Sequence, residues 1–285
     1  MSRIEPGINR LQRLLLILSL LLAANCARAA DGSADVVVIT FEPAVADALK
    51  AQLDSQDNPS AAGTGPESVR WTTGFVKSGR YPRPYRVVIG FSEASGQTAA
   101  REAADAALQR WRPRFLVRAG TAPGLNGSLA PRDVIVSRLV WRYEYTSAGL
   151  VYRHDESYRS SGAMITAAAT LDDEGKPRRP ARPRWGEVRT GAIASGNIAD
   201  VTDRALVAAI LSSNPRTLIA DRESAAVAAA VASARDRAIV VGHSVFFGVR
   251  ETAKPTADPA AGSGAEAVGA FTGELLRTRW PAAPR

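Results

Sequence analysis

The sequence predicts a single-domain α/β protein of three layers, with helices on both faces of a central, mixed and mostly parallel twisted sheet. Its 285 residues are 46% hydrophobic and 22% charged, a composition typical of globular proteins. Short β-branched runs alternate along the chain with alanine-rich segments at helical spacing. Strands joined by helices normally run parallel, so this alternation favours one sheet covered on both sides.

The strand and helix signals follow one another in order. The first strand is the β-branched run Val36–Thr40, and a helix is expected over residues 42–53. Further strands are predicted at residues 86–90, 115–119, 134–141, 188–194 and 238–241. Further helices are predicted at residues 97–111, 203–211, 223–234 and 266–277.

Three segments lack such signals. Residues 54–67 are polar and rich in Gly, Ser and Pro, which predicts a loop. Residues 147–184 are irregular and are expected to form an excursion over the site, with a flexible loop at 172–184. Residues 253–264, rich in Pro, Ala and Gly, are expected to be flexible.

The N-terminus has the pattern of an export signal. Arginines at positions 3, 10 and 13 precede an apolar stretch over residues 14–24, which is short for a membrane span of roughly 20 residues. Ala27 and Ala29 supply the small residues for cleavage after Ala29. We therefore expect a signal peptide at residues 1–29, a domain at 30–285, and a periplasmic or secreted protein that does not associate with the membrane after cleavage.

Two alternatives to cleavage remain open, an uncleaved membrane anchor and a lipoprotein attached through Cys26. Cleavage after Ala29 would remove this only cysteine, which excludes disulfides and a cysteine nucleophile from the mature protein. His154 and His243 are far apart in sequence and form no metal motif. We expect neither a metal nor a cofactor.

The net charge of +8 favours anionic partners such as phosphate or nucleotides. Part of it lies in the leader and part in the Arg/Pro-rich residues 176–184, which would also suit a solvated loop. No segment has the basic and aromatic pattern of a nucleic-acid-binding module, so nucleic acid is not expected as a partner.

Three loops that follow predicted strands are candidates for a site, because ligands of open α/β sheets bind beyond strand ends. Arg118 and Thr121 lie in a glycine-rich turn suited to an anion, although a plain Gly/Pro turn fits as well. Ser195 and Asn197 follow an apolar run, which by itself mostly signals a turn. Asp221–Ser224 opens a helix, where a carboxylate can bind a sugar diol or simply stabilise the helix N-terminus.

Taken in order, six segments resemble the phosphorylase superfamily of nucleoside phosphorylases and methylthioadenosine/S-adenosylhomocysteine nucleosidases. The segments are 36–43 (V-V-V-I-T-F-E-P), 90–100, 118–124 (R-A-G-T-A-P-G), 132–136 (R-D-V-I-V), 194–197 (A-S-G-N) and 222–225 (R-E-S-A). The similarity runs from Val36 to about Lys254. It implies a phosphorylase-like fold and cleavage of the N-glycosidic bond of a nucleoside by phosphate or water.

The resemblance also implies residue roles. Arg118 and Thr121 would hold phosphate or the ribose edge, and Glu223 would bind the ribose hydroxyls. Ser195 and Asn197 would lie near the base. Phosphate is then a candidate co-substrate, and a homo-oligomer is expected by analogy with the family.

The sequence departs from the family at its catalytic carboxylates. Ala44 stands where nucleosidases carry a water-activating glutamate, with Glu42 close by, and Val245 stands at the position of a base-protonating aspartate. Ala199 replaces a base-stacking aromatic residue. The candidate catalytic groups are therefore Glu42, Asp221 and His243.

Two functions follow from these observations. One is cleavage of a nucleoside by phosphorolysis or hydrolysis, with proton transfer by the substitute groups or with a pyrimidine base that needs less protonation. The alternative is a non-catalytic nucleoside-binding or sensing protein, because losing a general acid or base typically costs 10²–10⁴-fold in rate.

Overall fold

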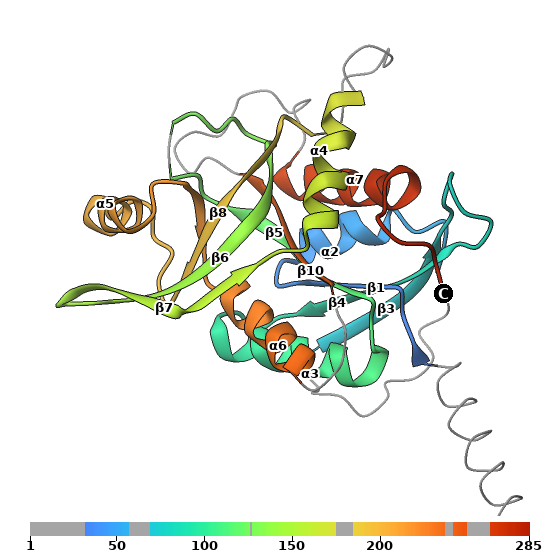
Figure 1. The fold of residues 1–285 in the computed structure, drawn as a ribbon, viewed down its shortest axis with the longest axis horizontal. Coiled ribbons are helices and arrows are strands. Elements are labelled where there is room, and N and C mark those ends of the chain that lie inside the picture. The colour runs from blue at the N-terminus through green and yellow to red at the C-terminus, as the bar shows by residue number, and fades with distance from the viewer. Residues whose placement is uncertain (1–31, 57–68, 126, 175–184, 237–241, 250–262) are drawn as a thin grey trace, which may run out of the picture. The chain divides into compact units, whose positions relative to one another are not determined.

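The computed structural model describes residues 32–56, 69–125, 127–174, 185–236, 242–249 and 263–285 (Figure 1). The chain divides into the units Met1–Ser33 and Ala34–Arg285, and all features below belong to the second. The predicted signal peptide lies outside the described residues. Among the described residues, no helix is both long and apolar enough to span a bilayer.

The second unit is built around one ten-stranded sheet with the order β2-β3-β4-β1-β5-β10-β6-β8-β9, in which β7 pairs with β6. The strands are β1 (Val36–Thr40), β2 (Ser55–Gln56), β3 (Val69–Val76), β4 (Tyr85–Ser92), β5 (Phe115–Ala122), β6 (Val134–Thr146), β7 (Gly149–Arg159), β8 (Val188–Gly196), β9 (Thr217–Asp221) and β10 (Gly242–Val249). The predicted mixed and mostly parallel sheet is confirmed.

The sheet contains two sets of parallel strands that run in opposite directions. Strands β4, β1, β5 and β10 are parallel to one another, as are β6, β8 and β9. The sets meet at the antiparallel pair β10–β6. Because β5 and β9 run in opposite directions, their carboxyl ends would point to opposite edges of a flat sheet. They can face the same region only if the sheet curls.

The curl is fixed by hydrogen bonding between the two sets. Just beyond β5, the N–H of Leu125 donates to the carbonyl of Leu218 in β9 at 2.9 Å, and Gly124 forms an antiparallel bridge to Ile219. Strand β9, at one end of the strand order, thus returns to the end of β5. This closure brings loops from both sets together.

Helices cover both faces of the sheet (Figure 1). Helices α2, α4 and α7 lie on one face, and α3 and α6 pack side by side on the other, while α5 packs outside β8 and β9. Their bounds are α2 (Pro43–Lys50), α3 (Gln97–Trp111), α4 (Gly162–Glu174), α5 (Arg204–Ser213), α6 (Ser224–Asp236) and α7 (Gly264–Thr278). The three-layer prediction is confirmed.

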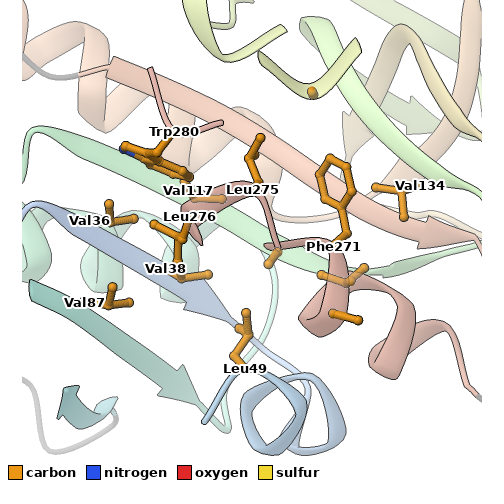
Figure 2. Packing of buried hydrophobic residues seen from close by; sticks show 14 of the residues in the cluster. Val36, Val38, Leu49, Val87, Val117, Val134, Phe271, Leu275, Leu276 and Trp280 are labelled. Atoms are coloured by element: carbon orange, nitrogen blue, oxygen red, sulfur yellow. The ribbon is translucent and has the colours of Figure 1, made fainter. Parts of the chain in front are cut away.

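Alternation along β1 explains how one strand serves two cores. Val36 and Val38 join the cluster under α2 and α7, together with Leu49 (Figure 2). Val37 and Ile39 join the cluster under α3 and α6. Because side chains alternate across a strand, a run of five buried residues requires cover on both faces.

Several predicted elements are found with the expected type. The helix at residues 97–111 has the predicted bounds, and the strands that begin at Val36, Phe115, Val134 and Val188 begin where expected. Strands β5 and β6 continue beyond the predicted ends.

Several predictions differ from the structure. The region predicted as irregular, residues 147–184, contains β7 and α4, although its residues 175–184 lie outside the described part. Strands β3 and β9 were not predicted. The predicted strand at 238–241 lies outside the described residues, and β10 occupies residues 242–249, for which no strand was predicted. Of the segments predicted to be flexible, 172–174 belong to α4, and nearly all of 253–264 lies outside the described residues.

We predict that Gly269→Ala destabilises the protein, although alanine is the better helix former by about 1 kcal/mol. A Cβ on Gly269 in α7 would lie 2.7 Å from the carbonyl oxygen of Ala48 in α2. Overpacking of this kind typically costs about 1–3 kcal/mol. The urea midpoint should fall with an unchanged m-value.

The matched control is Gly162→Ala, since a Cβ at Gly162 in α4 would meet nothing within 4 Å. A Gly269→Ala protein as stable as wild type would show that α2 and α7 are not packed as closely as described.

Candidate active site

Arg118 is the centre of a buried cluster of charges. Its side chain is only 3% exposed, and Nη2 donates to Glu223 Oε2 at 3.0 Å. Its Nε lies 3.8 Å from Asp221 Oδ2. A Cβ at Gly120 would lie 1.7 Å from Arg118 Nη1, so the guanidinium folds over the chain where glycine leaves room.

Glu42 approaches the same turn from the loop between β1 and α2. Its Oε1 accepts a hydrogen bond from the N–H of Thr121 at 2.7 Å, and its Oε2 accepts one from the Thr121 hydroxyl at 2.5 Å. The Cβ position of Gly120 is 2.7 Å from Glu42 Oε1. Glu42 and Arg118 therefore flank Gly120, and Glu42, which is half-buried, remains accessible to solvent.

The other two carboxylates come from the junction of β9 and α6. Asp221 ends β9 and accepts hydrogen bonds from Ser224, at 3.1 Å from the backbone N–H and 2.5 Å from the hydroxyl. Glu223 Oε1 accepts from the N–H of Gly96, at the start of α3, at 3.0 Å. One guanidinium is thus shared between two buried carboxylates.

The buried position of Asp221 changes its pKa. Burial raises its pKa to about 6, while attraction by Arg118 opposes the rise and repulsion by Glu223 adds to it. Hydrogen bonds from the hydroxyls of Ser224 and Ser195 also favour the ionised form. Asp221 therefore exchanges a proton close to neutral pH, as a general acid or base must.

Ser195 connects this cluster to the neighbouring helices. It is fully buried near the end of β8, and its Oγ accepts hydrogen bonds from Ala225 N–H at 3.0 Å and from Gln97 Nε2 at 3.3 Å. Gln97 also donates to the carbonyl of Arg222 at 2.8 Å. Ser195 thus fixes the start of α6, and with it Glu223.

A groove of about 700 Å³ adjoins the cluster between α3, α6 and the β6–β7 hairpin. Gln97 and Ala225, the two hydrogen-bond partners of Ser195, line the groove. Arginines and glutamates from α3 and from the hairpin line it as well. The lining residues are Gln97, Thr98, Arg101, Glu102, Arg142, Glu156, Tyr158, Ala225, Ala226, Ala229, Ala232 and Ser233.

The structure brings together most of the residues singled out from the sequence. Arg118, Thr121, Glu42, Asp221 and Glu223 form the cluster, and Ser195 lies against it. No three His, Cys, Asp or Glu side chains in the described part of the chain are arranged to hold a metal ion.

Asn197 faces away from the cluster, and the backbone of His243 lies within a strand. Asn197 is exposed, and its side-chain amide forms hydrogen bonds with the backbone N–H and carbonyl of Tyr145 at 2.8 and 2.9 Å. That amide holds the end of β8 to the β6–β7 hairpin rather than facing the cluster. His243 was expected after the late strand, but it is the second residue of β10 and pairs with Leu116 in β5.

The position assigned to the missing aspartate lies within a strand. Val245 is part of β10, opposite Arg118 in the register. The absence of an aspartate at the corresponding family position stays a prediction.

Sequence reasoning missed three residues that support the cluster. Gly96 contacts Glu223, and Gln97 contacts Ser195. Both lie in the segment 90–100 that resembles the family, but neither was given a role. Tyr143 of β6 is buried against Gly196, and its hydroxyl donates to the carbonyl of Ile198. Burial raises the pKa of Tyr143, which keeps the phenol neutral as a hydrogen-bond donor.

Comparisons with known proteins show which solved structures share this architecture. No family model and no curated protein matches the sequence. The 5'-methylthioadenosine/S-adenosylhomocysteine nucleosidase of Neisseria meningitidis, solved with methylthio-immucillin-A, is similar in structure, with a TM-score of 0.62 and 18% identity over 85% of this chain and 98% of that one.

Two structures from Helicobacter pylori are similar as well. The corresponding nucleosidase, bound to butyl-thio-DADMe-Immucillin-A, has a TM-score of 0.65 and 12% identity over 86% of this chain and 98% of that one. Futalosine hydrolase has a TM-score of 0.61 and 12% identity over 85% and 94%. The chain therefore has the fold of the nucleoside phosphorylase/nucleosidase superfamily, in a sequence that has diverged far from these examples.

We predict that Asp221→Asn removes a pH-dependent loss of stability. The folded pKa of about 6 lies above the unfolded value of about 3.9, so ionisation destabilises the fold as pH rises from about 4 to about 6. Over that window wild type should lose on the order of 2–3 kcal/mol relative to the variant. Urea unfolding at pH 4, 5, 6 and 7 measures both proteins.

Asp105→Asn is the control, because Asp105 pairs with Arg101 at the surface of α3. Parallel stability curves for wild type and Asp221→Asn would show that Asp221 does not carry the shifted proton.

Proposed function

We propose that the protein is a nucleosidase that hydrolyses the N-glycosidic bond of a nucleoside. The observation that carries the proposal is the convergence of Glu42, Asp221 and Glu223 on Arg118, in a fold shared with enzymes named for this chemistry. Fold alone does not set function, so the proposal rests on what these groups can do.

Glu223 is suited to hold the sugar. A carboxylate offers about four acceptor positions, and the bonds from Gly96 and Arg118 use one on each oxygen. The remaining positions can accept hydrogen bonds from two neighbouring hydroxyls. The sugar gains positive charge as the bond to the base breaks, and fixed carboxylates around it stabilise that charge.

Glu42 is suited to activate water. The N–H and hydroxyl of Thr121 hold both of its oxygens, and the side chain remains half-exposed. A water that donates to Glu42 can transfer its proton there as the oxygen attacks the anomeric carbon. The base then leaves with the electrons of the broken bond and takes up a proton.

Asp221 is suited to hold a proton near neutral pH, because its pKa is raised to about 6. It also lies inside the cluster, whereas the backbone of His243 pairs two positions before that of Arg118 along β5. Asp221 is therefore our candidate for proton exchange, either with the leaving base or with its neighbours. The hydroxyl of Ser224, the first residue of α6, donates a hydrogen bond to Asp221 at 2.5 Å.

The test is release of free base from a panel of nucleosides that includes methylthioadenosine and adenosylhomocysteine, with and without phosphate. Glu42→Gln should lower kcat about 10²–10⁴-fold with little change in KM, as expected for a lost general base. Glu223→Gln should impair both constants. Glu187→Gln, which changes an exposed carboxylate beside Arg189, is the control.

A second candidate is a nucleoside-binding protein without catalysis. It is favoured by the sequence, because Ala44 stands where nucleosidases carry a water-activating glutamate. This candidate predicts thermal stabilisation by a nucleoside, about 2.7 kcal/mol at 100 times the dissociation constant, with no base released. Base release by wild type, lost in Glu42→Gln, rules it out.

The location is proposed from the N-terminal sequence. The basic and apolar leader supports export with cleavage after Ala29, which predicts a mature protein that begins at Ala30. Intact mass and N-terminal sequencing of protein from the periplasm or medium measure this. A retained Met1 would indicate an anchor, and a lipid on Cys26 would indicate a lipoprotein.

A further inference from the structure

The amino end of β1 is enclosed by segments that carry arginines. The N–H of Ala34 donates to the carbonyl of Trp111 at 2.8 Å, and the N–H of Asp35 donates to the carbonyl of Arg86 at 3.0 Å. The N–H of Arg285 donates to Asp35 Oδ1 at 2.8 Å. The start of β1 therefore lies between the end of α3, the start of β4 and the segment that follows α7.

Three of these arginines alternate in the run R-W-R-P-R at residues 110–114. Arg112 is exposed, and Arg110 and Arg114 are partly exposed. Arg110 lies in the last turn of α3, where a basic residue ordinarily stabilises the helix C-terminus. Arg114 lies beyond the helix, so helix stabilisation does not account for the whole run.

One indole brings two of the arginines together. Arg86 of β4 and Arg110 of α3 both lie over the ring of Trp111, with Cζ 5.8 and 4.6 Å from the ring centroid. Trp111 is only 6% exposed, so it is not available to stack on a nucleic-acid base. The aromatic residue here orients cations and does not itself offer a binding platform.

The positive charge at this edge exceeds what the nearby carboxylate balances. Asp35 is buried, and its two oxygens accept the N–H groups of Arg86 and Arg285 at 2.9 and 2.8 Å. Arg112 and Arg114 form no ion pair with a carboxylate in the described part of the chain. Burial and the charge of Arg114 lower the pKa of Arg285, whereas Asp35 raises it.

The sequence before this edge favours a membrane as the partner. The expected cleavage site after Ala29 lies five residues before Ala34, a length of chain that spans at most about 18 Å. A chain whose leader is held in a membrane therefore keeps the start of β1 near the headgroups. Anionic phospholipids attract arginines at that distance, and salt weakens the attraction.

We infer that the protein docks on anionic phospholipid headgroups through an arginine surface, formed by Arg86, Arg110, Arg112, Arg114 and Arg285. The attachment is electrostatic and reversible, because the large apolar side chains exposed among the described residues, Val151 and Ile198, belong to β7 and to the loop after β8. The sequence alone predicted no membrane contact after cleavage, and this inference replaces that expectation.

Docking in this way leaves the candidate active site uncovered. The arginine surface lies at the amino end of β5, which begins at Phe115, whereas Thr121 lies near its carboxyl end. At about 3.3 Å per residue, the stretch from Phe115 to Thr121 spans about 20 Å. Headgroup binding requires no nucleoside, so the inference does not rest on the proposed function.

The experiment measures sedimentation of residues 30–285 with lipid vesicles. This part of the chain contains every strand, helix and core cluster described above. Phosphatidylcholine vesicles with about one-third phosphatidylglycerol should bind it at least about tenfold more strongly than vesicles of phosphatidylcholine alone. The difference should shrink as the salt concentration rises toward about 0.5 M, because salt screens exposed charges.

The test variant is Arg112→Gln combined with Arg114→Gln, which should bind the anionic vesicles at least about tenfold more weakly than wild type. Its matched control is Arg204→Gln combined with Arg216→Gln. These two exposed arginines lie at the start of α5 and just before β9, at the far end of the strand order, and their loss should leave binding unchanged.

Arg112→Glu is a second variant at a single exposed position, and it should weaken binding in the same direction. Circular dichroism and urea midpoints establish that each variant is folded. Equal binding of wild type to both kinds of vesicle would overturn the inference. Equal binding of wild type and the folded Arg112 variants, or an equal loss in the matched control, would overturn it as well.

A single-stranded oligonucleotide tests the other polyanion that arginines bind. Binding of the oligonucleotide without binding of anionic vesicles would assign the arginine surface to a nucleic acid and would also overturn the inference. Base release is measured separately, and its absence would count against the proposed function alone.

Discussion

The ion pairs of Arg118 depend on the closure of the sheet. A guanidinium that is almost wholly buried is stable only with carboxylates beside it, and those carboxylates come from the far end of the strand order. The hydrogen bond between Leu125 and Leu218 brings β9 to the end of β5 and so delivers Asp221 and Glu223. The opposite directions of β5 and β9 are no obstacle, because the sheet curls between them.

The resulting cluster has more carboxylates than cations. Glu42, Asp221 and Glu223 surround Arg118, and burial together with Glu223 raises the pKa of Asp221 to about 6. This surplus suits a reaction in which a sugar becomes positively charged, and it suits an attacking molecule that arrives neutral. The charge distribution and the position of Glu42 support the proposal that the nucleophile is water.

Much of the fold and of the cluster could be predicted from the sequence. The β-branched runs mark β1 and β5, and the motif segments contain Arg118, Thr121 and Glu223. The β7 strand escaped prediction because its residues are mostly polar and partly exposed, so no apolar run marks it. Because the β6–β7 hairpin was not predicted, the hydrogen bonds between the Asn197 side chain and the backbone of Tyr145 could not be predicted either.

The error at His243 has a similar origin. The apolar run at residues 238–241 predicted a strand that ends before Gly242. The structure describes β10 over Gly242–Val249, so His243 lies within a strand and not after one. Pairing with β5, which local composition does not reveal, extends the strand to Val249.

The junction of β5 with β9 makes assembly of the cluster inseparable from completion of the fold. A chain in which β1, β4 and β5 have formed but β9 has not yet docked would already contain Arg118, Thr121 and Glu42, with neither of the carboxylates that balance the arginine. The buried charge penalises that partial state, because Arg118 gains its partners only when β9 docks at the end of β5. The same residues that are proposed to bind a nucleoside thus favour all-or-none folding of the two sets of strands.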